Sequence, residues 1–443
     1  MPKQTDLVKK IVSLCKRRGI IFQNSEIYGG IGGFYDYGPI GSIMKYNLKN
    51  LWWNDNVIKR KDIVGIDGTI ITHPQVWHAS GHVKNFNDEL AECKSCHKRF
   101  RTDLLKNNNK QRPPVCPECD GQLTKGRKYN ILFETHIGVV EGEKTLSYLR
   151  GEACQNIYLN FKNIIDSSRV KIPFGIAQIG KAFRNEVNPK NFLYRSREFE
   201  QWDIQYFVHP KQMDKWYEYW KEQRMSWYQS LLNNKDNIRF RQHSKDELVF
   251  YAKKAFDIEY NTPWGWAEWE GIHWRADYDL TQHSKFSGKN LSYTDPITKE
   301  KYIPWIAETS GGVDRTFFYL LLDAYQEEKL ENDNTRTYLK IDPRIAAYKI
   351  CVIPLASNKP KLKKIAEKIY KKLSQQYSVD WDDSSNIGKK YRRQDEIGTP
   401  WCLVVDYQSL EDNTVTIRDR NTMSQVRLKS KEISCWLSQK LNS

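Results

Sequence analysis

The stretch of sequence that decides the fold is AFRNEVNPKNFLYRSREFEQWDIQYF, residues 182–207. Its pattern predicts two antiparallel strands, FRNE and REFEQWDIQYF, joined by a loop at NPKNF. Because side chains alternate along a strand, Arg184 and Glu186 should share one face of the first strand. One face of the returning strand should carry Arg197, Phe199, Gln201 and Asp203.

Together the two faces would combine guanidinium groups, carboxylates and an aromatic ring. Arginine forks match phosphate oxygens, a phenylalanine ring can stack on a base, and carboxylates can hold an ammonium group or a metal. The pattern therefore predicts a nucleotide and amino-acid site. The alternative is a solvated sheet face on which arginines and glutamates pair with one another.

Three further segments place charged residues beside apolar or glycine-rich sequence. In ETSGGVDR the two glycines allow close backbone approach, and Arg315 precedes a strongly apolar helix, where it needs an anion as partner. The other two segments are YLRGEACQNIYLNFK and WGWAEWEGIHWRADYDL, which carry Arg150, Glu152, Gln155, Glu268, Arg275, Asp277 and Asp279. The alternatives are a surface arginine, an ordinary helix start and a core segment edged by a salt bridge.

Four cysteines form two pairs, Cys93-x2-Cys96 and Cys116-x2-Cys119. Paired thiolates at this spacing can close a tetrahedron around Zn²⁺, and four protein ligands leave no open position for catalysis. We therefore predict a structural zinc site, and the alternative is four free buried thiols. Cys154 is a candidate reactive thiol, with an inert buried thiol as the alternative.

Composition sets outer limits on the function. The 443 residues carry 70 Lys and Arg against 54 Asp and Glu, a net charge of +16. This length favours about three domains, and the basic balance favours a nucleic-acid partner over a merely solvated surface. Aromatic residues make up 13% of the chain, which excludes a disordered protein. We find neither a run of about 20 apolar residues nor an apolar signal core, so we expect a cytoplasmic protein without membrane association.

Beyond Asp342-Pro343 the pattern changes to alternating strands and helices. KICVIPL, WCLVVDY and TVTIRD predict strands, and KLKKIAEKIYKKL and a segment near 430–440 predict helices. Such a pattern is typical of a compact α/β domain. It contains a basic run, Lys389, Lys390, Arg392 and Arg393. These cations would bind phosphates or stacked bases, or else pack against acidic residues of the same helix.

Four segments together resemble the class II aminoacyl-tRNA synthetases, and among them the homodimeric glycyl-tRNA synthetase family. SEIYGGIGGFYDYGPIG, with a helix over 40–59 that Pro39 can open, is similar to the family's dimer-forming first motif. FRNEVNPKNFLYRSREFEQWD and ETSGGVDR resemble its second and third motifs. IGKKYRRQDEIGTPWCLVVD with TVTIRDR is similar to its anticodon-binding domain, so the resemblance covers nearly the whole chain.

The resemblance implies an α+β catalytic domain, an antiparallel sheet flanked by helices, formed by residues 1–90 and 125–340. Residues 91–124 would be a zinc-ribbon-like insertion, and residues 341–443 an α/β anticodon-binding domain. The implied reaction is ATP-dependent attachment of glycine to tRNA(Gly) by a homodimer. Glycyl-adenylate forms first, and the glycyl group then passes to the 3′-terminal adenosine of the tRNA.

By the same resemblance, ATP would be held by Arg184, Glu186, Arg195, Phe199 and Arg315, with Mg²⁺ on its phosphates. Arg184 would be the catalytic residue, because it bridges the α-phosphate and the glycine carboxylate and neutralises charge developing at phosphorus. Arg195 and Arg315 would hold the terminal phosphates. Phe199 would stack on adenine, and Glu186 would face the amino group of the base.

Glycine offers no side chain to recognise, so the site must bind its ammonium group and exclude anything larger. The resemblance implies that Glu152, Asp203 and Glu308 surround the ammonium group and that Ser310 lines the α-carbon. Larger amino acids would then be excluded by clash.

The chain departs from the family pattern around this pocket. It has RGEACQN at residues 150–156 where the family usually has RPETAQG. Asp203 stands where glutamate is usual, one methylene shorter. His273-Trp274 is unusual between Gly271 and Arg275. These departures bear on the affinity for glycine more than on the ATP site.

Three alternatives stay open. A non-catalytic, synthetase-like dimer that binds nucleic acid would be expected to lack Arg184, Arg195 and Arg315. A class II synthetase for serine, proline or threonine is disfavoured by the first motif and the anticodon-domain signature. The four-cysteine module is either a stand-alone nucleic-acid finger or an insertion that orders a loop against the acceptor end of tRNA.

Overall fold

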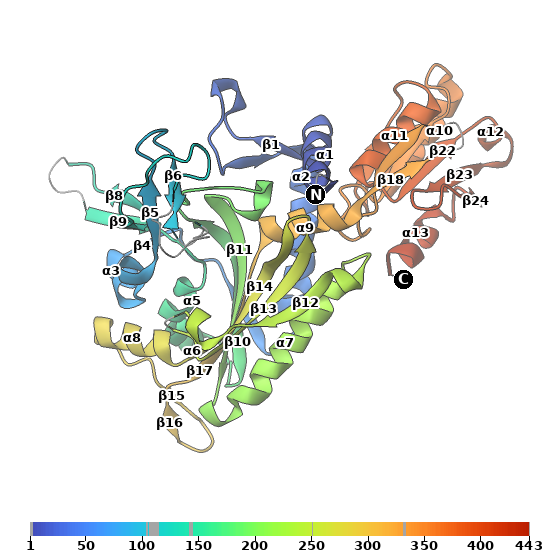
Figure 1. Cartoon of the computed structure of the whole chain (residues 1–443). Helices are drawn as coiled ribbons and strands as arrows, with labels where there is room; N and C mark the ends of the chain where they lie inside the picture. The colour runs from blue at the N-terminus through green and yellow to red at the C-terminus, as the bar shows by residue number, and fades with distance from the viewer. Residues whose placement is uncertain are drawn as a thin grey trace.

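A seven-stranded sheet forms the centre of the larger part of the molecule in this computed structural model (Figure 1). The structure describes residues 3–102, 105, 115–140, 145–249, 251–330 and 334–442. The strand order is β12 (Ile238–Gln242), β13 (Lys254–Thr262), β14 (Gly265–Ala276), β17 (Trp305–Gly312), β11 (Glu198–Val208), β10 (Phe174–Phe183) and β3 (Ile63–Ile66). All neighbouring strands are antiparallel except β3, which runs parallel to β10. The predicted antiparallel sheet with flanking helices is confirmed, with one parallel edge strand.

Long helices pack against this sheet: α2 (Pro39–Trp53), α7 (Met213–Gln229) and α9 (Val313–Ala324). Helix α1 (Lys3–Arg17) packs on α9 instead. In the shared core, Trp52 of α2 stacks on Trp202 of β11 with ring centroids 5.5 Å apart. The helix predicted over 40–59 begins at Pro39 and continues past Trp53 as a π turn over Asn54–Ile58.

The shorter helices α5 (Gln155–Leu159), α6 (Phe161–Ser167) and α8 (Tyr278–Ser287) contribute to a second apolar cluster that includes residues of β10 and β11. Helices α3 (Pro74–Ala79) and α4 (His82–Asn85) contribute Trp77 and Val83 to a separate, smaller cluster. Small sheets complete this part: β1 (Ile21–Gln23) with β2 (Tyr35–Tyr37), β4 (Ile71–Thr72) with β9 (Thr145–Leu149) and β8 (Phe133–Ile137), and β15 (Tyr293–Thr294) with β16 (Lys301–Tyr302).

The predicted strand–loop–strand unit is present, with one correction. The returning strand is β11, but β10 ends at Phe183, so a strand over the remainder of FRNE was wrong. Pairing stops because the N–H of Asn185 donates to the carbonyl of Ile131, 2.7 Å away, outside the sheet. The predicted position of Arg197 was also wrong, since its side chain donates to the backbone carbonyls of Glu186 and Gly32.

A module that carries the cysteines stands beside the central sheet. Its strands are β6 (Arg99–Arg101), β5 (Asn87–Glu92) and β7 (Arg127–Asn130), with β5 in the middle. Residues 103–104 and 106–114 of the predicted insertion lie outside the described residues. At the base, the Asn130 side chain donates to the carbonyls of His82 and Val83 at 3.2 and 2.9 Å.

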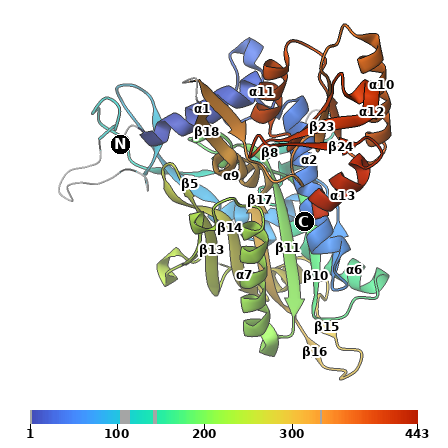
Figure 2. The same cartoon turned by 90° about the vertical axis from the view of Figure 1, so that its right-hand side faces the viewer.

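The C-terminal residues form a separate α/β domain (Figure 2). A hairpin of β18 (Tyr325–Lys329) and β19 (Thr335–Leu339) precedes it. Its sheet has the order β21 (Val379–Trp381), β20 (Ile350–Pro354), β22 (Trp401–Val405), β23 (Thr414–Asp419) and β24 (Gln425–Lys429). Its helices are α10 (Pro360–Leu373), α11 (Ile387–Ile397), α12 (Ser409–Asp412) and α13 (Ile433–Asn442). Arg18 of α1 ties this domain to the rest, since its Nε lies 2.5 Å from Oε2 of Glu396 on α11.

None of the described helices combines the length and the apolar composition that a membrane crossing requires.

Candidate active site

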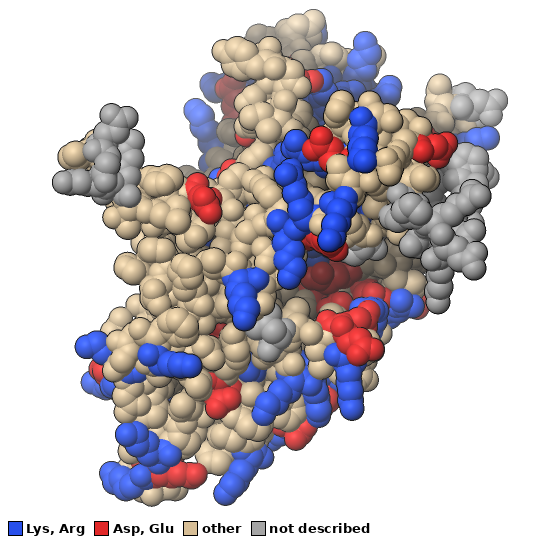
Figure 3. Space-filling model, turned by 60° about the vertical axis from the view of Figure 1, so that its left-hand side comes forward, with Lys and Arg blue, Asp and Glu red and all other residues tan. Residues whose placement is uncertain are grey.

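A cleft of about 410 Å³ lies over the face of the central sheet that β11, β17 and β14 form. It brings together most of the predicted site residues: Arg184, Glu186, Arg195, Phe199, Arg315, Glu152, Glu308 and Ser310. Asp203 lies beside it, directly opposite Ser310 on the neighbouring strand. On the face seen in Figure 3, basic side chains border a hollow in whose depth acidic side chains lie.

Strand register explains why these residues meet. Asp203 of β11 pairs with Ser310 of β17, which pairs with Gly271 of β14. Two residues along, Gln205 pairs with Glu308 and Glu308 with His273. Because the side-chain period of a strand is two, both rows present their side chains on the same face of the sheet.

Neutral groups hold the guanidinium group of Arg184 in place. Its guanidinium carbon lies 5.0 Å from the ring centroid of Phe86 and 5.5 Å from that of Phe199. Its Nε donates to the carbonyl of Gly151 at 3.0 Å. It forms no ion pair with any described residue, so its positive charge is free to meet an anion in the cleft.

The other two cleft arginines contact carboxylates. Arg315 Nη1 lies 3.1 Å from Oε1 of Glu268, and the Arg315 guanidinium stands over the ring of Tyr194. The charge of Arg315 holds the pKa of Glu268 below its ordinary value. Arg195 Nη1 is 3.6 Å from Oε2 of Glu186. An incoming phosphate would share or replace these carboxylate partners.

Glu152 is buried and stays ionised. Its Oε1 accepts hydrogen bonds from Cys154 Sγ and Gln155 Nε2, both at 3.0 Å, and lies 3.1 Å from His82 Nε2. Burial alone would raise the pKa of Glu152, but His82 and the charge of Arg275 hold it well below its ordinary value. The pocket therefore contains a permanent negative charge suited to an ammonium group.

Glu308 and Asp203 differ in how many hydrogen bonds their carboxylate oxygens accept. Glu308 accepts from Arg275 Nη1 at 3.0 Å and from Gln205 Nε2 at 2.9 Å. Burial opposes ionisation, yet Arg275 and His273 lower the pKa of Glu308 to about 2. Asp203 is 1% exposed, and its Oδ2 has no hydrogen-bond partner among the described residues. Burial and the charge of Glu308 raise the pKa of Asp203 well above its usual range, and a cation beside this carboxyl would favour its ionised form.

The structure adds cleft residues that sequence reasoning did not place there. They are His82, His243 and Asp257. Gln201, predicted to share a face with Phe199, also lines the cleft. His82 stands near the cysteines in sequence, but its ring nitrogens contact Ser80 and Glu152. No spacing pattern connects residue 82 with residue 152, so only the fold reveals this contact.

Cys154 is a buried thiol, 1% exposed. Burial and the neighbouring charge of Glu152 raise its pKa well above the ordinary value. Because the thiolate is the reactive form, burial and the raised pKa favour the inert alternative.

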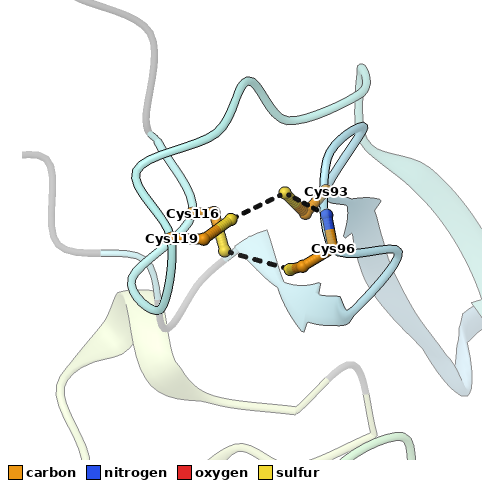
Figure 4. A group of neighbouring side chains, drawn as sticks. All are labelled: Cys93, Cys96, Cys116 and Cys119. Carbon is orange, nitrogen blue, oxygen red and sulfur yellow. Dashed lines mark hydrogen bonds between the residues drawn. The ribbon is translucent and has the colours of Figure 1, made fainter.

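The four predicted cysteines converge at the tip of the module (Figure 4). Cys93 Sγ and Cys119 Sγ are 3.5 Å apart, and Cys96 Sγ and Cys116 Sγ are 3.7 Å apart. Four thiolates at about 2.3 Å from a central Zn²⁺ would be separated by about 3.8 Å in a tetrahedron. The donor set and its spacing therefore fit a structural zinc ion.

The basic run on α11 is largely consumed inside its own domain. Lys390 is fully buried and donates to the carbonyl of Pro354 at 2.9 Å. Arg393 makes two bonds to the carboxylate of Asp382, and Arg392 pairs with Glu396 one turn along the helix. Neither alternative for this run describes all four side chains. Arg392 pairs with an acidic residue of the same helix, Lys390 and Arg393 bond to other elements of the domain, and Lys389 is exposed.

Comparisons with known proteins agree with this arrangement. Residues 139–325 match the family model of the tRNA synthetase class II core domain (G, H, P, S and T), and residues 349–440 match that of the anticodon binding domain. The central sheet, the cleft and these matches define the class as class II aminoacyl-tRNA synthetases.

Relatives narrow the class further. The chain is 50% identical over 431 residues to a glycine–tRNA ligase of Treponema denticola, covering 96% of this chain and 95% of the relative. It is 49% identical over 426 residues to that of Borreliella burgdorferi strain B31, covering 95% and 94%. For that of Thermobifida fusca the identity is 45% over 463 residues, covering 100% and 99%. The chain belongs to the glycine–tRNA ligase family.

Proposed function

We propose that this protein attaches glycine to tRNA(Gly) with ATP, in two steps at the cleft over β11, β14 and β17. The single observation that carries this proposal is the guanidinium of Arg184, which has no ion pair among the described residues, beside a pocket of buried carboxylates. A polyphosphate and an ammonium group are the two charges that such a pair of subsites would bind together.

In the first step, a carboxylate oxygen of glycine attacks the α-phosphorus of ATP. The bond from that phosphorus to the bridging oxygen of the β-phosphate breaks, and pyrophosphate leaves. Arg184 would bridge the two reactants and neutralise charge on the transferring phosphoryl group. Arg195 and Arg315 would hold the leaving phosphates, with Glu186 facing the adenine amino group and Phe199 stacked on the adenine ring.

Glycine would bind through its ammonium group at Glu152 and Asp203. The unpartnered Oδ2 of Asp203 supports this assignment, because an ammonium donor would satisfy it. The negative charge of Glu308 would add to the attraction for the ammonium group. Ser310, opposite Asp203, would line the pocket beside the α-carbon. In the second step, the terminal adenosine hydroxyl of tRNA attacks the glycyl carbonyl and AMP leaves.

Four further features belong to this proposal: two metal ions, the cellular location and the oligomeric state. Mg²⁺ would neutralise the ATP phosphates, and Zn²⁺ would be held by Cys93, Cys96, Cys116 and Cys119 as a structural ion. The enzyme would act in the cytoplasm as a homodimer. The exposed apolar side chains of Ile27 and Tyr28, 88% and 87% accessible, support a second copy packing on the glycine- and tyrosine-rich segment.

The decisive experiment is amino-acid-dependent ATP–pyrophosphate exchange with glycine, alanine, serine, proline and threonine. Exchange with glycine alone is the expected result. Exchange with another of these amino acids would assign a different substrate. Exchange with none, in protein shown to be folded and metal-replete, would support the non-catalytic nucleic-acid-binding alternative.

A further inference from the structure

The imidazole of His273 lies over a glycine on the floor of the cleft. A Cβ added at Gly271 would meet His273 Cε1 at 2.6 Å, so the ring fills the volume that a side chain at 271 would take. Gly271 pairs with Ser310, which in turn pairs with Asp203. The ring therefore stands in the row where the α-carbon of the amino acid is expected.

The ring is held from several sides. Its Nδ1 lies 3.0 Å from Oε2 of Glu308, which Arg275 fixes from the other side. The rings of His243 and Tyr251 stand edge-on to it, with centroids 6.4 and 6.2 Å away. Only 15% of the His273 side chain is exposed, so its ring is a well-packed part of the cleft wall.

The remainder of this floor is nearly without side chains. Gly271, Gly311 and Gly312 all line the cleft, and Ser310 is small. The carboxylates cannot distinguish glycine from alanine, because both amino acids carry the same ammonium and carboxylate groups. To exclude the methyl group of alanine, the pocket needs rigid atoms beside the α-carbon. Among these residues of the floor, His273 carries the bulky ring.

We propose that His273 is the steric wall that limits the amino-acid pocket to glycine. The inference rests on the proposed function, because it names what makes the same site specific. The His273 ring fills space on the same floor as the row that joins Gly271, Ser310 and Asp203.

The test is a series of variants graded by side-chain volume: His273→Ala, His273→Asn and His273→Phe. For each, kcat/KM of pyrophosphate exchange is measured with glycine, alanine and serine. We expect the preference for glycine over alanine to fall about 10-fold or more in His273→Ala, the range that one methyl group commands in a pocket. The loss should be smaller in His273→Asn.

His273→Phe separates the steric role from positioning of Glu308. Phenylalanine keeps a ring but cannot donate a hydrogen bond to the carboxylate of Glu308. If His273 acts as a steric wall, His273→Phe keeps the preference for glycine over alanine. If His273 only positions Glu308, His273→Phe loses that preference as His273→Ala does. His136→Ala is the matched control, since His136 is an exposed imidazole on β8 that does not line the cleft. Its preference for glycine should stay within about twofold of the wild type, well inside the effect of one methyl group.

Each outcome decides something distinct. A glycine-specific wild type with an unchanged preference in His273→Ala overturns the steric wall and leaves the proposed function standing. A wild type without glycine exchange overturns both. If His273→Ala does not fold, equal preferences in His273→Asn and His273→Phe overturn the wall equally well.

Discussion

The cleft and helix α11 both concentrate arginines and lysines, yet they use them in opposite ways. In the cleft, Arg184 is held by two rings and a backbone carbonyl, so its charge faces open space. On α11, the Arg393 guanidinium is matched by both oxygens of Asp382, and Lys390 is buried against Pro354. Arg184 keeps its charge available because neutral groups hold it, whereas the Lys390 and Arg393 side chains are taken up by partners within their own domain.

Replacing Arg184 should produce the largest effect. Arg184→Ala should lower the kcat of glycine-dependent exchange by about 10³-fold, because it removes charge stabilisation in the transition state. The melting temperature should hardly change, since no described carboxylate loses a partner. Steady-state exchange and thermal unfolding measure the two quantities. A fall of less than about tenfold would show that Arg184 is not aimed at the reacting phosphate.

Losing the metal site should affect the cleft and spare α11. Cys116→Ser should lower the zinc content measured by elemental analysis, and exchange should fall by about tenfold. The reason is that Phe86, which packs on Arg184, directly precedes strand β5 of the module. Cys435→Ser is the control, because Cys435 is exposed on α13 and distant from the cluster in sequence. Full activity in zinc-free Cys116→Ser protein would contradict this coupling.

Breaking the α11 pair should cost stability and not binding. Arg393→Ala leaves the buried Asp382 without its partner, so the free energy of unfolding should fall by about 1–3 kcal/mol. The salt dependence of tRNA binding should stay the same, whereas Lys389→Ala, at an exposed position, should reduce its slope. Denaturant unfolding and tRNA binding at several salt concentrations test this. An unchanged stability together with weaker tRNA binding would reverse the assignment.

A carboxylate of the same domain should show the smallest effect and a defined pH window. Hydrogen bonds from Arg427 lower the pKa of Asp406 from 3.8 to about 2. The depressed pKa stabilises the fold above about pH 4, and the contribution disappears as pH falls towards 2. Asp406→Asn should therefore lower the free energy of unfolding by less than about 1 kcal/mol at pH 7, since the pair is partly exposed. Chemical denaturation at pH 7, 4 and 3 should show the difference shrinking only at pH 3.

Local patterns were sufficient for much of the fold. The alternation in REFEQWDIQYF predicted β11, and the apolar spacing in KLKKIAEKIYKKL predicted α10. The paired cysteine spacing predicted the cluster, because its ligands lie within two tight turns. Resemblance to a family, rather than periodicity, supplied the residues of the amino-acid pocket.

What the sequence could not reveal depends on contacts between distant segments. The end of β10 depends on Ile131, which competes for the N–H of Asn185. The roles of His82 and Lys390 depend on partners 70 and 36 residues away. The face of α11 depends on Asp382, which sits on a different element from the acidic residues of the helix itself. Such pairings follow from packing, which a single chain's local pattern does not encode.

The base of the cysteine module also bears on how proteins of this kind can change over time. Asn87 and Asn130, at the two ends of the module, are paired residues of neighbouring strands. Because the chain leaves and returns at one point, the length between them can vary at little entropic cost. The Asn130 side chain also donates hydrogen bonds to the backbone of the segment that carries His82. The length and sequence of the module can therefore change while its attachment point stays the same. A shortened version that keeps both asparagines should leave the amino-acid pocket in place.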